Sequence, residues 1–600
     1  MKGPFLAGAC VVAVFIPCLF AAGPPPAATS SGYRNTGPGV RYVGSNACIG
    51  CHRSIFETYR LTAMGRSMGP ANTPSELEKV PEPFTTFEPK FNRHYRVFRE
   101  GPDLFQSVDE QDASGRIVFT AKHKLEYVVG AGLTGYSYVV RRGNHLFQAP
   151  LSYYSETREW GFSPGYEFVD HSFSRPILLG CIVCHSGRPN AAPVGMGAYQ
   201  EPPLHELAIG CENCHGPGEI HVSERGRKAR PKVDTSIVNP ARLPARLADD
   251  ICMNCHQGGG TRILQPDRNY TDFRPGGPLY LTSAIFKLPL RIGQREQANL
   301  AERLPPTRGS LSPPTWWKNT AMQLSRCFQG SAGKLRCITC HNPHETPSRQ
   351  AAPAFFRRKC LQCHTDASCG LPAAERVAQN PPNDCAGCHM PKRPVGGISH
   401  SESTNHRIMK QAGQELPEVA FEEPSADLPD LICFNKPAGV TDRDLPLLTK
   451  LGAYGELAEK NPHLLPRYLA VLELCAKSLP DHPLVLAALG RKALLNDDPR
   501  ALDFLTRARQ AGSDSLETFV DLDKALVKAG KIEEAARVLE TAAELYPYAP
   551  VISRTLILRR INLKEYSRAR ELMRRHMGLF PEDSLMRALL AKVDAGEPAR

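Results

Sequence analysis

The reactive residues of this chain are concentrated in a five-residue pattern, Cys-x-x-Cys-His, which occurs seven times. In a c-type haem site the two thiols bond to the vinyl groups of the porphyrin, and the adjacent histidine binds the iron. The cysteines of the seven copies are Cys48, Cys51, Cys181, Cys184, Cys211, Cys214, Cys252, Cys255, Cys337, Cys340, Cys360, Cys363, Cys385 and Cys388. The histidines are His52, His185, His215, His256, His341, His364 and His389. The pattern predicts seven covalently attached haem c groups, each with its iron.

Zinc is the alternative chemistry for these residues, because Cys-x-x-Cys pairs also suit tetrahedral Zn²⁺. Seven pairs do not divide into four-cysteine sites, and zinc gives no reason for a histidine to follow every pair. We therefore expect haem at these sites.

Histidines outside the pattern are candidates for the second axial ligand of each iron. In the octapeptide Cys337–His344, the side chain of His344 cannot reach the far face of the haem that His341 holds. We therefore expect His344 to bind the iron of a neighbouring site. Further candidates are His221 beyond the Gly-Pro-Gly turn after the third motif, His205 before that motif, and His400 and His406 after the last motif.

Two methionines after the first motif could also supply a ligand. A thioether from Met64, or less favourably Met68, would complete the first iron site; the alternative is that both pack against the porphyrin. His171 is a weaker candidate than His205. Upstream of residue 441, nine histidines outside the motifs are available for seven second-ligand positions, so six-coordination of every iron does not require all of them.

Two cysteines outside the motifs, Cys327 and Cys369, bracket two of the haem sites. In an oxidising compartment they could form a disulfide. Two free thiols, or a thiolate ligand, are the alternatives. Cys475 lies on a helical pattern and is expected to be a core residue.

The first 22 residues have the features of an export signal. Lys2 precedes an apolar run that ends before Gly-Pro-Pro-Pro, so residues 1–22 predict a cleaved signal peptide, with an uncleaved anchor as the alternative. Residues 23–40 are a flexible lead-in. No later segment is apolar enough to span a bilayer. We therefore expect a periplasmic or extracellular protein, which agrees with haem attachment outside the cytoplasm.

The formal charge of +12 would ordinarily suggest an acidic partner. Haem propionates would offset most of it, and no arginine-rich block with interleaved aromatics favours nucleic-acid binding.

Residues 41–410 are expected to form the haem domain, mainly α-helical with little regular structure around a multihaem core. Within it, residues 91–166 carry no motif and predict an inserted β subdomain. Its clearest sign is a hairpin in which 136–142 and 145–148 flank Gly143-Asn144. The histidines of this insertion, His94, His123 and His145, are expected on strand surfaces. Residues 257–336 read as irregular chain.

The C-terminal part has a 34-residue period. Ala501, Ala535 and Ala569 are 34 residues apart, as are Pro547 and Pro581. This is the length of a tetratricopeptide repeat, in which a small residue lets two helices pack closely. After a Pro- and acid-containing linker at 411–440, residues 441–600 therefore predict an α-solenoid that docks a protein partner. The alternative is a helical cap without a ligand.

The motifs resemble those of the multihaem c-type cytochromes related to the tetrahaem electron carrier of ammonia oxidation and the pentahaem nitrite reductase. The resemblance rests on Val43-Gly44-Ser45, on 211–218 with His221, on 340–344 and on 388–392. It implies haems packed in parallel or perpendicular pairs, with distal histidines from remote motifs. The nitrite-reducing members hold their catalytic haem through Cys-x-x-Cys-Lys, which is absent here.

Together these features predict an exported cytochrome that transfers electrons along a chain of seven haems. No catalytic residue is assigned. The alternatives are a multihaem oxidoreductase acting on a small nitrogen or sulfur oxyanion at a five-coordinate haem, and an interaction scaffold with structural haems.

Overall fold

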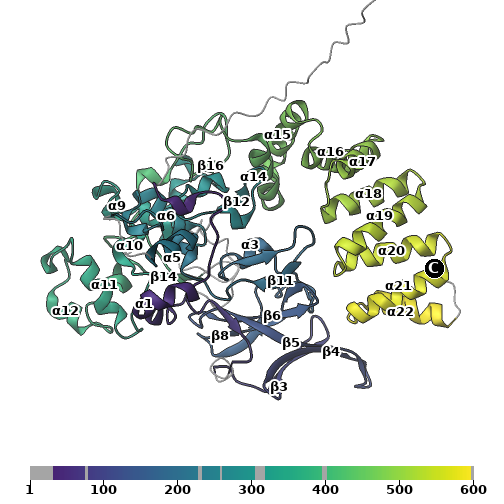
Figure 1. Ribbon diagram of the computed structural model, residues 1–600, viewed down its shortest axis with the longest axis horizontal. Helices are drawn as coiled ribbons and strands as arrows, with labels where there is room; N and C mark the ends of the chain where they lie inside the picture. The colour runs from purple at the N-terminus through teal and green to yellow at the C-terminus, as the bar shows by residue number, and fades with distance from the viewer. Residues whose placement is uncertain are drawn as a thin grey trace, which may run out of the picture.

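The computed structural model describes residues 32–73, 79–226, 233–256, 260–303, 318–394, 402–411 and 413–595. Figure 1 shows an antiparallel sheet in blue, a part rich in short helices that carries the motifs, and an array of paired helices in green to yellow. The predicted signal at 1–22, the first half of the lead-in and His400 lie outside the described residues. Among the residues described, none of the helices has the length and apolar character needed to cross a membrane.

A nine-stranded antiparallel sheet forms the largest regular element before the helical array. Its strands are β1 (Met68–Pro70), β2 (Phe84–Glu88), β3 (Arg93–Glu100), β4 (Asp103–Gln111), β5 (Ile117–Val129), β6 (Gly135–Arg142), β7 (His145–Gln148), β8 (Leu151–Tyr154) and β9 (Glu159–Phe162). The order is β2-β3-β4-β5-β6-β8-β9, with β1 beside β5 and β7 beside β6. The predicted hairpin is confirmed, since β6 and β7 pair Arg142 with His145 across a left-handed Gly143.

The expectation that this half of the chain is mainly α-helical is wrong. The sheet begins at Met68 rather than near residue 91, and further strands follow it. These are β10 (Pro189–Ala191), β11 (Tyr199–Leu204), β12 (Thr261–Leu264), β13 (Ser283–Lys287), β14 (Lys392–Pro394), β15 (Glu402–Thr404) and β16 (Ile432–Cys433). Several of them contain proline, which reads as a turn signal but is tolerated where a strand lies at the edge of a small sheet.

The segment 257–336 is also more regular than expected. Besides β12 and β13 it contains α7 (Arg295–Arg303), α8 (Lys318–Gln323) and α9 (Arg326–Gly330). The segment 411–440, expected to be a linker, contributes to a core: β16 pairs with β13, and Leu428 and Leu431 are fully buried.

Short helices carry or flank the motifs. They are α1 (Asn46–Tyr59), α3 (Leu179–Ile182), α4 (Glu212–His215), α5 (Glu219–Arg225), α6 (Ala245–Met253), α10 (Cys337–Cys340), α11 (Ala352–Cys360), α12 (Ala373–Ala378) and α13 (Cys385–His389). None of residues 326–393 is buried, although this segment holds three motifs and four of these helices. The segment therefore has no core made of its own side chains.

The C-terminal region is a series of antiparallel helix pairs. Its helices are α14 (Leu447–Lys460), α15 (Leu465–Ser478), α16 (Pro483–Leu495), α17 (Ala501–Gln510), α18 (Leu516–Lys528), α19 (Ile532–Leu545), α20 (Pro550–Asn562), α21 (Tyr566–Leu579) and α22 (Ser584–Asp594). The small residues of the predicted repeat, Ala501, Ala535 and Ala569, are all buried. The expected solenoid of repeats is thus confirmed.

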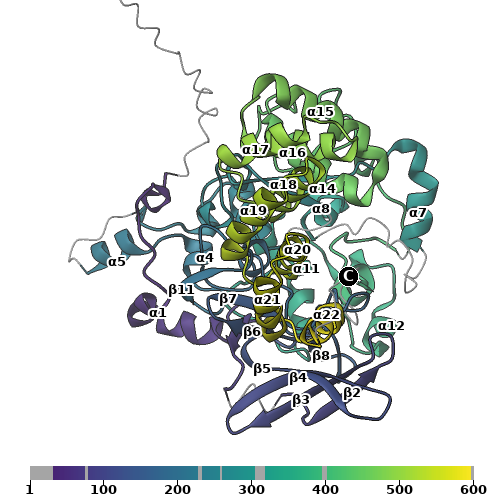
Figure 2. The same ribbon diagram turned by 90° about the vertical axis from the view of Figure 1, so that its right-hand side faces the viewer.

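Loops between the last repeats pack on the β-sheet. The guanidinium of Arg142, at the end of β6, lies 4.7 Å from the ring centroid of Tyr548 and donates a hydrogen bond to the Leu579 carbonyl. His145 packs edge-on against the same tyrosine. In the view of Figure 2 this helical region lies in front of the rest of the molecule. Residues far apart in the sequence thus join the two regions.

Candidate metal centres

Three pairs of histidine rings face each other in the motif-bearing region. In the first pair, His52 and His221 have ring centroids 6.3 Å apart and ring planes inclined by 21°. His52 ends its motif at a kink in α1, where its backbone leaves helical geometry (φ −118°, ψ 32°). His221 comes from α5, and its Nδ1 lies 3.0 Å from the Ser236 hydroxyl and 3.1 Å from an Asp234 carboxylate oxygen.

The second pair joins the third motif to the octapeptide. His215 and His344 have nearly parallel rings, inclined by 6°, with centroids 6.0 Å apart. Nδ1 of His215 lies 2.8 Å from the Val238 carbonyl oxygen, which orients the ring. Burial lowers the pKa of both imidazoles, so the neutral form that binds metals is favoured.

The third pair joins the octapeptide to the segment after the last motif. The rings of His341 and His406 have centroids 6.1 Å apart and planes inclined by 31°. Nδ1 of His406 lies 2.9 Å from the Thr404 carbonyl oxygen, and Phe356 packs edge-on against His341. The two histidines of the octapeptide therefore face different partners.

The spacing within each pair suits two imidazoles that share one metal ion. A metal–imidazole bond is about 2 Å long and the ring centroid lies roughly 1.2 Å beyond the nitrogen, which gives a centroid separation of roughly 6.4 Å. Metal-binding histidines usually donate their other ring N–H to a carbonyl or carboxylate, which fixes the tautomer and the ring orientation. In His215, His221 and His406, Nδ1 has such a partner, so Nε2 is the ring nitrogen that remains to bind a metal.

The remaining motif histidines have varied surroundings. Nδ1 of His389 lies 2.6 Å from the Met409 carbonyl oxygen, so this ring is oriented in the same way. His185 is solvent-accessible, yet the protein around it lowers its pKa by desolvation. His256 and His364 are exposed.

Among the residues described, none of the other candidate ligands makes a ring contact with a motif histidine. The side chain of His205 is exposed just after β11, and Met64 is partly buried in the turn after α1. Met68, the first residue of β1, is buried in an apolar core, in agreement with a packing role. His94, His123 and His145 lie in strands, but His145 is buried against Tyr548 rather than on a strand surface as expected. His171 packs against Tyr166.

The motif cysteines lie close to one another across different motifs. Three pairs of thiols lie near enough to shift each other's pKa: Cys48 with Cys211, Cys184 with Cys255, and Cys252 with Cys337. All cysteines of the described residues are free thiols, so Cys327 and Cys369 do not form the disulfide considered above. Burial raises the pKa of the Cys327 thiol, which does not favour the thiolate.

No three His, Cys, Asp or Glu side chains converge as ligands for a bare metal ion within the part of the chain that the structure describes. Two opposed imidazoles suit a metal whose other ligands come from a porphyrin, as in c-type haem.

A hydrogen-bonded Ser-His-Asp series occurs in the helical region and was not anticipated from the sequence. Nδ1 of His576 lies 2.7 Å from the Ser553 hydroxyl, and its Nε2 lies 2.8 Å from an Asp583 carboxylate oxygen. The His576 side chain is fully buried, and Asp583 also accepts a hydrogen bond from the Met586 amide at the start of α22. The series therefore joins α20, α21 and α22, with His576 and Asp583 buried between them.

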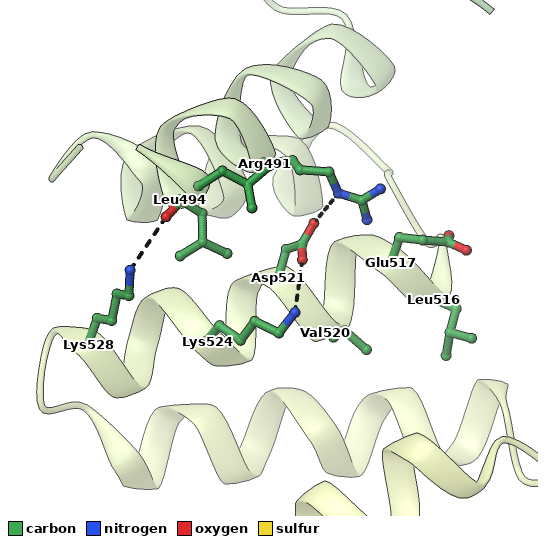
Figure 3. Close-up of a pocket in the computed structure, with 9 residues that line it drawn as sticks. Arg491, Leu494, Leu516, Glu517, Val520, Asp521, Lys524 and Lys528 are labelled. Carbon is green, nitrogen blue, oxygen red and sulfur yellow. Dashed lines mark hydrogen bonds and ion pairs between the residues drawn. The ribbon is translucent and has the colours of Figure 1, made fainter. Parts of the chain in front are cut away.

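A groove of about 520 Å³ lies between α16 and α18 (Figure 3). Asp521 forms an ion pair with Arg491 across it and a second one with Lys524 on its own helix, and Lys528 donates a hydrogen bond to the Leu494 carbonyl. The other side chains that line it are Leu495, Leu516, Glu517 and Val520. Apolar and charged groups thus alternate along this face of the repeats.

Comparisons with known proteins concern the helical repeats. The tetratricopeptide repeat family matches residues 526–593. Among solved structures, the chain is similar to YrrB, described as a TPR protein with an unusual peptide-binding site, with 18% identity over 26% of this chain and 81% of that one, at a TM-score of 0.23. It is also similar to MamA, with 19% identity over 24% of this chain and 83% of that one, at a TM-score of 0.21. No curated protein matches.

The chain therefore carries tetratricopeptide repeats at its C-terminal end. Repeats of this kind form surfaces that bind partner proteins.

Proposed function

We propose that this chain is an exported c-type cytochrome that binds seven haems covalently and transfers electrons, and that its repeats dock a redox partner protein. The observation that carries the proposal is the set of three opposed histidine pairs. Each pair joins a motif histidine to a histidine from another part of the chain, at the spacing that one iron requires. The tethered Nδ1 atoms leave the opposed ring nitrogens to bind it.

The exposure of residues 326–393 supports a large apolar cofactor. A folded segment needs a buried apolar core, and this one has none among its own side chains. Phe355, Phe356 and Leu361 are only partly covered. Porphyrins attached at the three motifs of this segment would supply the missing apolar contact.

The positions of the motif cysteines support a connected series of sites. Motifs one and three meet at Cys48 and Cys211, and motifs four and five meet at Cys252 and Cys337. The second motif meets the fourth at Cys184 and Cys255. The third motif is linked to the fourth by the effect of Cys252 on the pKa of Cys214. Effects of the same kind link Cys340 to Cys363 and Cys360 to Cys385. When bound, haem iron would supply one-electron chemistry, and each site's potential would depend on axial ligands and burial.

Arginines beside the motifs are suited to haem propionates. Arg262 is partly buried next to Cys184 and Cys255, and burial lowers its pKa, as expected for a cation that has lost solvent without gaining a carboxylate. Arg357 and Arg376 lie beside Cys385. A propionate beside Arg262 would compensate its positive charge, whereas Arg357 and Arg376 already form ion pairs with Asp366.

The α16–α18 groove is the surface that we propose for partner docking. It is lined by apolar side chains beside exposed charges, as is usual at the core and rim of protein interfaces. Arg142 and His145 of the sheet pack against Tyr548, in the loop between α19 and α20. These contacts attach the repeats to the sheet.

A redox titration of the full chain, produced in a host that attaches c-type haem, tests this function. We expect uptake of seven electrons per chain and low-spin ferric spectra. Haems that dithionite does not reduce would favour the scaffold alternative. A high-spin ferric signal in the wild-type chain, with nitrite or carbon monoxide binding, would favour the oxidoreductase alternative.

A further inference from the structure

We infer that Glu212, a residue of the third motif, positions both histidines of the first metal centre. This inference rests on the proposed function, because it concerns the site where His52 and His221 would hold one iron. Glu212 occupies a variable position of its Cys-x-x-Cys-His pattern, and nothing in that pattern gives it a role.

The Glu212 carboxylate is buried, with 3% of the residue exposed, and it binds backbone amides from a remote segment and from the turn that follows its own motif. Its Oε1 accepts hydrogen bonds from the amides of Val43 and Gly218 at 3.0 and 2.6 Å. Its Oε2 accepts one from the amide of Gly44 at 2.7 Å. Hydrogen bonds from amides to a buried carboxylate are among the stronger ones in proteins.

The two segments lead into the two helices that carry the histidine pair. Val43 and Gly44 lie just before the N-cap residue of α1. This helix contains the first motif and its histidine, His52. Gly218 is the N-cap residue of α5, which carries His221. One side chain therefore fixes the starting points of both helices, and the separation of the two rings depends on it.

The backbone around Glu212 is adapted to this close approach. A Cβ atom at Gly218 would lie 2.9 Å from Cγ2 of Val43 and 3.2 Å from Oε1 of Glu212, so a side chain there would push the segments apart. The buried Asn35 holds the intervening turn, since its Nδ2 donates hydrogen bonds to the carbonyls of His215 and Pro217 at 2.8 and 3.1 Å. Glu212 thus acts within a rigid support.

A second carboxylate joins the same two segments at the surface and provides a matched control. Glu219, the first residue of α5, accepts hydrogen bonds from the Arg41 amide at 2.9 Å and from its Nε at 2.7 Å. The Arg41 side chain is 81% exposed. Exposed ion pairs of this kind contribute little to stability, so removing Glu219 should leave the ring pair in place.

The test compares Glu212→Ala, Glu212→Gln, Glu219→Gln and His221→Ala in the full chain by haem content and ferric electron paramagnetic resonance. We expect seven haems in every variant. His221→Ala should convert one low-spin signal to high spin. Glu212→Ala should weaken or convert that same signal and no other. A variant that combines Glu212→Ala with His221→Ala should resemble His221→Ala alone. Glu212→Gln, which retains one acceptor oxygen, should show a smaller change, and Glu219→Gln should match the wild type.

A wild-type spectrum from Glu212→Ala, or a change in a haem that His221→Ala leaves untouched, would overturn the inference. If Glu212→Ala does not fold, an unchanged spectrum from Glu212→Gln gives the same negative answer. A wild-type chain with fewer than seven haems would instead overturn the proposed function, so the two failures are distinguishable.

Discussion

His215 and His344 lie with their rings almost parallel and their centroids 6.0 Å apart, although His344 belongs to the octapeptide whose own motif histidine is His341. His341 faces His406 instead. The eight residues 337–344 therefore supply one ring to each of two centres. Two groups bound at these two centres would therefore be linked through this short stretch of backbone.

Replacement of His344 by alanine should change the centre of His215. We expect all seven haems to remain attached, because the thioether bonds do not involve His344, and one haem to become high-spin because it loses an axial ligand. Ferric resonance and magnetic circular dichroism would count that haem.

The haem of Cys337–His341 should keep its low-spin signal in this variant. The matched control is His205→Ala, since His205 is exposed and has no ring contact with a motif histidine among the residues described. A change at the haem of His341 would show that the pairing is different.

In a chain that lacks haem, residues 326–393 should be unfolded while the repeats remain folded. Residues 326–393 have no buried side chain, whereas the repeats bury residues such as Leu539, Ala542 and Ile552 completely. Produced without haem attachment, the full chain should be cleaved early within 326–393, while the repeats resist. Limited proteolysis with mass spectrometry would locate the cuts. Equal resistance of both regions would show that the segment folds without a cofactor.

Two helical glycines of the repeats, one inside α16 and one near the end of α21, should respond oppositely to alanine. A Cβ at Gly490 in α16 would lie 2.5 Å from Cγ of Leu505, so Gly490→Ala should cost about 1–3 kcal/mol through overpacking. At Gly578 in α21 a Cβ meets nothing within 4 Å, and Gly578→Ala should stabilise by roughly 0.5–1 kcal/mol because alanine favours the helix. Urea denaturation followed by circular dichroism would measure both. Equal effects would contradict the close packing of α16 on α17.

The contact between the repeats and the sheet should weaken as pH rises through the titration of Glu582. Burial is the main cause that raises the pKa of this carboxyl to about 6, with Asp170 acting in the same direction and Arg142 and Arg93 opposing it. The folded state therefore binds more protons than the unfolded state between about pH 4.5 and 6. Stability is greatest below this range and falls across it, by on the order of 2 kcal/mol.

Glu582→Gln should remove this part of the pH dependence. The comparison is the urea midpoint of the full chain at pH 4 and pH 7, for the wild type and the variant. If the difference between the two pH values is the same in both proteins, another group is responsible.

The sequence predicted those features that depend on residues close together in the chain. The seven motifs, the hairpin around Gly143-Asn144 and the 34-residue spacing of Ala501, Ala535 and Ala569 are visible in short windows. They correspond to the motif helices, to the β6–β7 pairing and to the buried positions of the repeats.

Features that depend on distant contacts were not predictable in this way. The sequence suggested that His344 serves another site, but only tertiary packing places it opposite His215. The early start of the sheet was missed because β1 and β2 are short and flank a proline-rich segment. Glu212 was missed because its partners, Val43 and Gly44, are remote in the chain and offer only backbone amides, which no residue type reveals.

The most direct test of the whole account is the intact mass of the full chain, denatured after production in a host that attaches c-type haem, together with its zinc content. Covalent haem survives denaturation, so we predict a mass increase of seven haems per chain and no stoichiometric zinc. A chain that carries no haem, or that binds zinc at its cysteine pairs, would contradict the account.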